Sequence, residues 1–317
     1  MKTILLFPGL DAIESDALRE QVTTWPEVMA RIEEAQTLLD RARIPLSLTQ
    51  TLLSPRQETL AWFSSMVLAA MAVQVGVFDR YQQQGHPIQG LLGISMGDLA
   101  RSVCAGVAAF PQAFMGLQQF LQKLPPVLGQ GSTYQVKCAD PNIDLLAALR
   151  CEDFGVAVSV HQSDQSALVA GPIDRLQAWY AYIRHQPTLK AFELFAIPVP
   201  LHHSLMQPVA LQLTDYVDQH AAFDRAQYPI YSTIYQKSLG SQTELQSEIL
   251  ANIHSTVHFA PTIHQLVQNH GALHFVSIGP APTLLAFIRQ MNLPNDQVRL
   301  TDYFAEETAR IHNPESR

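Results

Sequence analysis

The spacing of hydrophobic residues predicts a strand and then two helices in the first part of the chain. Residues 2–7 form a short apolar run that stops at Pro8-Gly9, as a buried strand does. Residues 27–43 carry apolar residues at helical spacing with polar residues between them, which predicts a helix. From about residue 58 to 84 the helical pattern is apolar nearly all round in its middle, which predicts a core helix.

The middle of the chain carries a different pattern. A Pro/Gly-rich stretch at 124–131 predicts a linker. The patterns after it, up to about residue 198, are strand, helix, strand, strand, helix and strand, which predicts a small α+β insertion. The mixed pattern then returns and ends with a strand at 273–279 and a helix at 282–291.

Composition narrows the class of protein. The 317 residues are 47% hydrophobic, which is enough for a large core in one or two domains. A net charge of -8 without a basic cluster excludes a nucleic-acid binder. Three cysteines with no CxxC spacing argue against a disulfide scaffold or a zinc knuckle and fit a reducing compartment. No signal sequence and no stretch near the ~20 apolar residues of a membrane span are recognised, so a cytoplasmic protein is expected.

The strongest chemical signal lies where a strand pattern becomes a helix pattern. Residues 89–94 are short, apolar and flanked by glycines, and from Met96 the spacing is helical. Ser95 stands at this junction, inside a GxSxG sequence. A serine hydroxyl is a poor nucleophile, so it needs exposure on a sharp turn, a base and donors for an oxyanion. The pattern predicts a nucleophilic serine; the alternative is a glycine-rich turn whose serine caps the helix.

A nucleophilic serine needs a histidine as its base. The chain has twelve histidines, of which His202 and His203 follow an extended segment and precede a helical pattern. Catalytic groups collect at strand ends in α/β sheets, so this pair is the best source of a base.

Five ordered segments resemble those of the malonyl-CoA:acyl carrier protein transacylases and the acyltransferase domains of polyketide synthases. FPG at 7–9 resembles the opening of that family, and 93–107 resembles its serine elbow and the helix that follows. VPLHHSLM at 199–206 is similar to its histidine segment. The late segments at 257–259 and 277–285 also have counterparts there.

The resemblance implies an α/β fold with two parts. An α/β-hydrolase-like large domain would comprise residues 1–127 and 196–317. A ferredoxin-like α+β small domain would be inserted at 128–195. The predicted linker at 124–131 fits this division.

The resemblance also implies a ping-pong reaction through an acyl-serine ester. Ser95 would be the nucleophile, and His202, in place of His203, the base. A backbone carbonyl near residues 255–258 would orient the histidine. The backbone N–H groups of Met96 and Leu10 would form the oxyanion hole.

Departures from the family's motifs point to the acyl group. Ile94 replaces a polar residue beside the nucleophile and is expected to bind substrate with Phe120 and Leu201, and Met96 would direct an apolar chain at the acyl pocket. Phe120 stands where malonyl-selective members carry an arginine, and Leu201 replaces their serine or phenylalanine before the base. A buried carboxylate without a partner costs several kcal/mol, so an uncharged acyl group is favoured.

Two family features persist. Gln57 matches a glutamine that lines the active site in the family, and Lys190 matches a basic residue near the entrance that pairs with a CoA or carrier phosphate. An ordinary solvated lysine is the alternative for Lys190.

Arg101 is either a displaced carboxylate clamp or, by preference, a solvated helix residue. His254 and His258 have the spacing of two metal ligands on one helical face, but no carboxylate follows, and no metal is expected.

The sequence therefore predicts an acyltransferase of polyketide or fatty-acid type biosynthesis. It would be a monomer that acts on acyl carrier protein and acyl-CoA, with phosphopantetheine thioesters as substrates and no bound cofactor. Three alternatives remain open. The first is a hydrolase that removes stalled acyl chains from carrier proteins, and the second a plain malonyl-CoA transacylase. The third is a non-catalytic docking module, against which Ser95, His202 and Gln57 argue.

Overall fold

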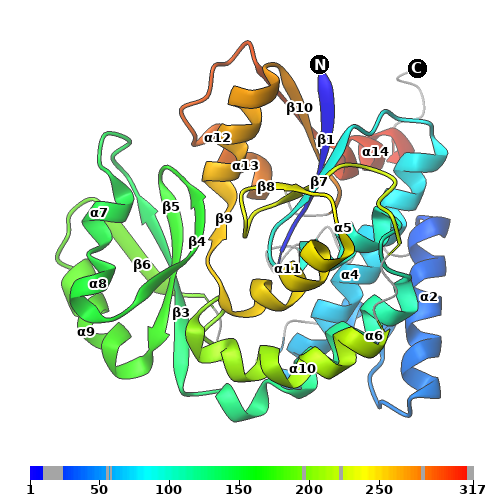
Figure 1. Ribbon diagram of the computed structural model, residues 1–317, viewed down its shortest axis with the longest axis horizontal. Coiled ribbons are helices and arrows are strands. Elements are labelled where there is room, and N and C mark those ends of the chain that lie inside the picture. The colour runs from blue at the N-terminus through cyan, green and yellow to red at the C-terminus, as the bar shows by residue number, and fades with distance from the viewer. Residues whose placement is uncertain are drawn as a thin grey trace.

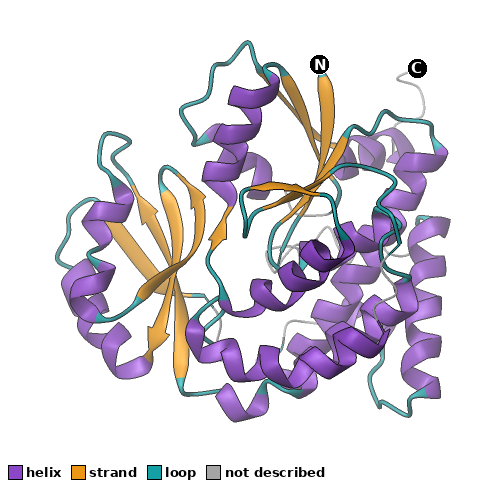
Figure 2. Cartoon of the chain, viewed as in Figure 1, coloured by secondary structure: helices purple, strands orange, loops and turns teal. Residues whose placement is uncertain are grey.

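The strands form two separate sheets (Figures 1 and 2). The computed structural model describes residues 1–9, 24–54, 57, 59–194, 198–220, 224–279 and 283–312. Leu10, predicted for the oxyanion hole, lies outside the described residues. The larger sheet has six strands in the order β11-β10-β1-β2-β7-β8, and the smaller has five in the order β6-β3-β5-β4-β9.

The larger sheet is parallel except at its β8 edge. Its strands are β1 (Lys2–Phe7), β2 (Gly90–Gly93), β7 (Ile230–Ser232), β8 (Lys237–Leu239), β10 (Leu273–Ser277) and β11 (Val298–Asp302). The predicted strand at 2–7 is confirmed as β1, which is central and buried along most of its length. Such a strand is apolar because both faces of a parallel sheet are covered.

Helices surround the larger sheet (Figure 2). Those before the small sheet are α2 (Pro26–Arg41), α3 (Leu48–Leu53), α4 (Leu60–Gln83), α5 (Gly97–Cys104), α6 (Phe110–Gln122) and η2 (Pro125–Val127). Those after it are η3 (Ser204–Met206), α10 (Gln207–His220), α11 (Gln242–His254), α12 (Phe259–His270), α13 (Thr283–Arg289) and α14 (Tyr303–His312).

Helix α4 confirms the predicted core helix but corrects the statement about membrane spans. Among the described residues it is one helix long and apolar enough to cross a membrane, yet 78% of its most apolar window is buried inside the protein. Polar residues such as Ser65 and Gln74 interrupt the apolar sequence of α4, so α4 contains no uninterrupted apolar stretch of the length of a membrane span. Burial of this kind is that of a helix in the protein core.

The smaller sheet confirms the predicted order of elements between 131 and 193. Its strands are β3 (Gly131–Cys138), β4 (Ala157–Ser163), β5 (Ser166–Pro172), β6 (Leu189–Glu193) and β9 (Val257–His258), with helices α7 (Leu145–Leu149), α8 (Cys151–Phe154) and α9 (Ile173–Ile183). A separate hydrophobic cluster that includes Leu149, Val169 and Trp179 packs this unit. Strand β9 comes from the later part of the chain and pairs in parallel with β4.

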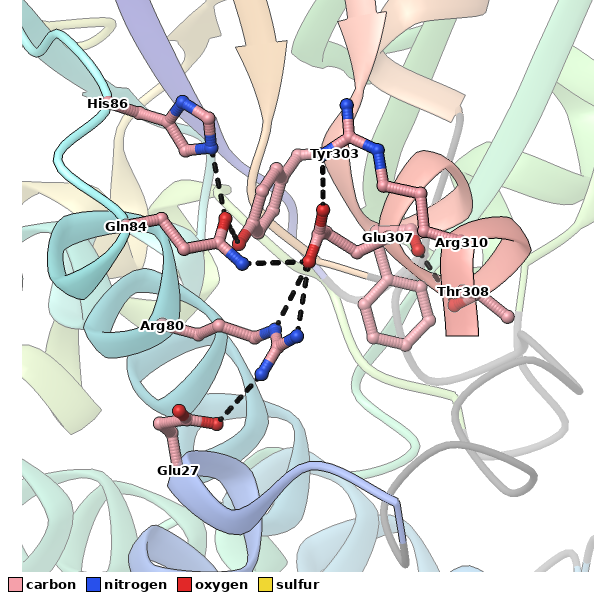
Figure 3. A network of polar contacts seen from close by, with 9 residues as sticks. Glu27, Arg80, Gln84, His86, Tyr303, Glu307, Thr308 and Arg310 are labelled. Atoms are coloured by element: carbon pink, nitrogen blue, oxygen red, sulfur yellow. Dashed lines mark hydrogen bonds and ion pairs between the residues drawn. The ribbon is translucent and has the colours of Figure 1, made fainter. Parts of the chain in front are cut away.

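A network of polar contacts holds α14 against α4 (Figure 3). Arg80 of α4 and Gln84, which caps the end of α4, both donate to Glu307, at 3.1 and 2.8 Å. The Tyr303 hydroxyl donates to Gln84 at 2.8 Å, and Arg80 also stacks over Trp25, 5.0 Å from the ring centre. Burial of Glu307 raises the pKa of its carboxyl, but its hydrogen bonds outweigh this and the net pKa is lowered. The network therefore joins the last described helix to the core.

Candidate active site

Ser95 sits on a strained turn between β2 and α5. Its φ is 57°, in the left-handed region that non-glycine residues seldom occupy. Steric crowding explains the glycines two residues before and two residues after Ser95. A Cβ on Gly97 would lie 2.1 Å from the Phe7 carbonyl oxygen, and one on Gly93 would lie 2.5 Å from Asp98 Oδ1. The GxSxG sequence is thus required by the tight packing of the turn against β1 and α5.

His202 lies directly beside Ser95. The Ser95 Oγ and His202 Nε2 atoms are 2.7 Å apart, and His202 Nδ1 is 2.5 Å from the Asn252 carbonyl oxygen. A carbonyl can only accept, so Nδ1 carries the proton and Nε2 is left to accept the proton of Ser95. Burial lowers the pKa of His202 to about 4, against a raising effect of the bond to Asn252. The resting imidazole is therefore neutral, as a general base must be.

His203 is not placed to act on Ser95. It caps η3, where its Nδ1 accepts from the Leu205 N–H at 3.2 Å. His202 itself has a φ of 54°, so both members of the Ser95–His202 pair occupy strained backbone conformations.

The carbonyl that holds His202 belongs to Asn252, which corrects the expectation of residues 255–258. Helix α11 ends at His254, and the N–H of Ser255 caps it by bonding to Ala251. The carbonyls of a last helical turn have no partner within their own helix. Asn252 offers one of these free carbonyls, and the imidazole satisfies it.

The Asn252 side chain also supports the turn, a feature that the sequence reasoning missed. Its Nδ2 donates to the Ser95 carbonyl oxygen at 3.3 Å and to the Asp98 carboxylate. One residue thus contacts both Ser95 and His202. No motif could have revealed it, because the contact joins segments that are distant in sequence.

Arg101 is fully buried, which corrects the preference for a solvated residue. It pairs with Asp98 at 2.9 Å and with Glu248 of α11, and it donates to the Tyr231 carbonyl at 2.9 Å. These partners occupy it, and it does not line the cavity described below, so it is not a carboxylate clamp. Burial raises the pKa of Asp98 to about 7, although the charge of Arg101 opposes the shift.

A cavity of about 230 Å³ opens beside Ser95. Met96, Phe120 and Leu201 are among its lining residues. Most of the other lining residues are apolar and come from α4, α6, α10 and α11. Asp98 and Asp224 are its acidic residues, and no Lys or Arg lines it within the described part of the chain.

Ile94 is not beside this cavity, contrary to expectation. It packs in the cluster that contains Ile4, Leu6 and Leu92, whereas Leu91 and Met96 belong to the cluster on the cavity side. Side chains alternate between the two faces of a strand, and Ile94 continues the alternation of β2. Its side chain therefore faces away from the acyl pocket.

Two other predicted site residues, Gln57 and Lys190, do not line the cavity. Gln57 is exposed and is not in the lining. Lys190 is exposed on β6, opposite Lys137 of β3. The N–H of Met96 donates to no backbone acceptor within the described residues, which leaves it available at the turn.

His254 and His258 do not lie on one helical face. His254 is the last residue of α11, and His258 lies in β9, so the two do not share a helix. Over the described ranges, no group of three or more His, Cys, Asp or Glu residues could hold a metal ion.

Comparison with known proteins identifies the family. The family model described as acyl transferase domain matches residues 24–299. The chain belongs to the acyl transferase domain family, and it is an acyltransferase.

The relatives of this acyltransferase are distant in sequence and close in fold. It is 25% identical over 229 residues to a malonyl CoA-acyl carrier protein transacylase of Bacillus subtilis, over 70% of this chain and 56% of the relative. The Haemophilus influenzae protein of the same name is 22% identical over 89% of this chain and 90% of its own length. A malonyl-transacylase solved in complex with the acyl carrier protein of a type II polyketide synthase superimposes with a TM-score of 0.83, at 20% identity and 96% coverage of both chains.

Proposed function

We propose that this acyltransferase moves an uncharged acyl group from a CoA or carrier-protein thioester to an acyl carrier protein, through an ester on Ser95. The observation that carries the proposal is the chain of contacts from Ser95 through His202 to the Asn252 carbonyl, beside a mostly apolar cavity that no described Lys or Arg lines. Carrier protein as partner is supported by the complex in which a similar structure was solved.

The first half of the reaction loads the enzyme. Ser95 Oγ bonds to the thioester carbonyl carbon while its proton passes to His202 Nε2. The carbonyl oxygen becomes an oxyanion, which the N–H groups of Met96 and Leu10 would stabilise. The C–S bond then breaks, and the leaving thiolate takes the proton from His202.

The second half reverses these steps with a new thiol. The phosphopantetheine thiol of the carrier gives its proton to His202 and attacks the ester carbonyl. The bond to Ser95 Oγ breaks, and His202 returns the proton to that oxygen. Throughout, the Asn252 carbonyl keeps Nδ1 protonated and favours the transient imidazolium.

An uncharged acyl group is supported by what lines the cavity. Phe120 occupies the position expected for a carboxylate-binding arginine, and Arg101, the nearest cation of the elbow helix, is paired elsewhere. A malonyl carboxylate would lose its hydration without gaining a charged partner, which costs several kcal/mol. The names of the relatives favour a second candidate, the plain malonyl-CoA:acyl carrier protein transacylase.

The organisation of the chain is part of the proposal. We infer an α/β-hydrolase-like large domain from 1–127 and 196–317, and a ferredoxin-like small domain from 128–195. Support comes from the two sheets and from the separate core of the smaller unit. We also propose a cytoplasmic monomer without a bound cofactor. Lys190 and Lys137, side by side on the small sheet, would meet a phosphate of CoA or of the carrier.

Intact-mass analysis tests the reaction. After incubation with octanoyl-CoA, the wild type should gain one octanoyl mass on the peptide that contains Ser95, and added holo carrier protein should remove it. Ser95→Ala should gain none. A carrier that never acquires the acyl group while the ester is lost to water would identify a hydrolase. An acyl mass on Ser95→Ala at the wild-type rate would sink the assignment of the nucleophile.

A further inference from the structure

Gln74 is an amide buried in the apolar core helix α4. Its side chain is fully buried, and its neighbours in the helix, Val73 and Val75, are buried and apolar. Its Nε2 donates to the Pro8 carbonyl oxygen at 3.0 Å, whereas its Oε1 has no hydrogen-bond partner within the described residues. A buried polar atom without a partner destabilises the folded protein, so stability alone does not explain a glutamine here.

The Pro8 carbonyl lies where the end of β1 meets the turn that carries Ser95. A Cβ on Gly97 would lie 2.7 Å from this oxygen, so the Pro8 peptide packs directly against the first residue of α5. A Cβ on Gly279 would lie 2.9 Å from Pro8 Cγ and 3.4 Å from Gln74 Cγ. Pro8 is therefore enclosed by α5, by α4 and by the segment after β10, with the Gln74 amide as the donor to its carbonyl.

The position of this carbonyl influences where the following backbone points. The peptide group between Pro8 and Gly9 is planar, so a bond that holds the carbonyl also holds the N–H of Gly9. Gly9 leads to Leu10, whose N–H is, with that of Met96, a donor of the proposed oxyanion hole. A glycine restricts its own φ and ψ least, so the direction of the Leu10 N–H depends on how firmly the preceding peptide is held.

We propose that Gln74 is a positioning residue for the oxyanion hole: its amide holds the Pro8 carbonyl and thereby aligns the backbone that presents the Leu10 N–H to the thioester oxygen. This inference rests on the proposed function, because it assumes an oxyanion on the way to the ester on Ser95. Oxyanion donors act on charge that develops in the transition state. Gln74 should therefore affect the rate constant of acylation and leave the binding of the thioester almost unchanged.

Replacement of Gln74 by methionine removes the donor and keeps the length of the side chain. The first acylation of Ser95 by octanoyl-CoA is followed by intact mass over a range of thioester concentrations, which separates the maximal rate constant from the half-saturating concentration. Gln74→Met should lower the maximal rate constant by about 10–100-fold, because a donor displaced by about 1 Å stabilises the transition state less. The half-saturating concentration should stay within about twofold.

Urea unfolding separates positioning from a structural role. Gln74→Met exchanges one unpaired oxygen, the amide Oε1, for another, the Pro8 carbonyl, so the urea midpoint should change little. Gln118→Met is the matched control, because Gln118 is also a buried glutamine and accepts a hydrogen bond only from Gln119 of its own helix, α6, within the described residues. It should keep the wild-type rate constant within about twofold.

Gln74→Glu tests whether the hydrogen bond itself is the cause. A neutral carboxyl can donate to the Pro8 carbonyl as the amide does, and burial favours the neutral form. At about pH 5.5 this variant should stay within about threefold of the wild-type rate constant, which Gln74→Met loses. If Gln74→Glu is as slow as Gln74→Met at that pH, the hydrogen bond is not the cause and the inference is overturned.

The outcomes distinguish this inference from the proposed function. If the wild type and Gln74→Met are acylated at the same rate, positioning is wrong and the acyl-serine reaction stands. If Gln74→Met does not fold, Gln74→Leu is measured in its place, and failure of both to fold would assign the amide to stability and overturn the inference. If no thioester acylates Ser95 in the wild type, the proposed function fails and the inference with it.

Discussion

The two sides of Ser95 are built in different ways. On one side, Ser95, His202 and Asn252 are joined by hydrogen bonds in which the backbone takes part, and a buried ion network supports them. On the other side, the cavity beside α6 and α10 is lined mostly by apolar side chains, and no Lys or Arg among the described residues lines it. The contacts of Ser95 and His202 thus depend in part on backbone groups, whereas the character of the cavity depends on side chains.

Removal of the base should have the largest effect on the polar side. His202→Ala should slow Ser95 acylation by about 10⁴-fold or more, since loss of a partner of the nucleophile has costs of that order. His203→Ala is the matched control and should stay within about threefold, because its imidazole caps η3 and does not contact Ser95. Single-turnover intact mass measures both. A larger loss in His203→Ala would move the base to that residue.

A cation placed on the apolar side should change selectivity. Phe120→Arg should raise malonyl acylation relative to octanoyl by about tenfold or more, since a charge-assisted pair is worth a few kcal/mol. Phe120→Leu is the neutral control and should keep the preference for octanoyl. Rate constants for both thioesters give the ratio. An unchanged ratio in Phe120→Arg would show that residue 120 does not reach the acyl group.

The buried ion network should matter to the free energy of unfolding. Arg101→Met leaves Asp98 and Glu248 buried without their cation, and we expect a loss of about 3–5 kcal/mol. Adding Glu248→Met should recover part of it. Arg150→Met removes an exposed pair with Asp153 and should have no measurable effect. Urea unfolding compares the variants, and equal stability of Arg101→Met and Arg150→Met would contradict a structural role.

The smallest effect concerns pH. The neutral imidazole is the active form, and burial lowers the pKa of His202 to about 4, so the acylation rate should be nearly constant from pH 8 to 5 and fall only below that. Burial raises the pKa of Asp98, which contacts Asn252, so its titration should add a minor inflection that vanishes in Asp98→Asn. A steep fall through pH 6.5 in both proteins would show that His202 is not shielded as described.

The features that depend only on local backbone geometry could be predicted from short stretches of sequence. The change from strand to helix at Ser95, the glycines around it and the segment that carries His202 all lie in short stretches with steric requirements of their own. The order of elements in the small sheet followed from periodicity in the same way.

Contacts between distant segments could not be predicted. The Asn252 carbonyl has no sequence signature, because any residue supplies a carbonyl at a helix end. Arg101 was expected in solvent because its partner Glu248 comes from another helix. Ile94 was expected in the pocket because it stands next to Ser95. Side chains alternate between the two faces of β2, however, and this alternation turns Ile94 to the opposite face.

Competition between two thioesters tests the central claim most directly. The wild type is mixed with equal concentrations of malonyl-CoA and octanoyl-CoA, and the acyl mass on Ser95 is read before a second turnover. We predict octanoyl in preference to malonyl by about 10²-fold or more, because a carboxylate that finds no cation among the described lining residues is destabilised by several kcal/mol. Predominant malonyl loading would contradict the account and establish the plain malonyl transacylase in its place.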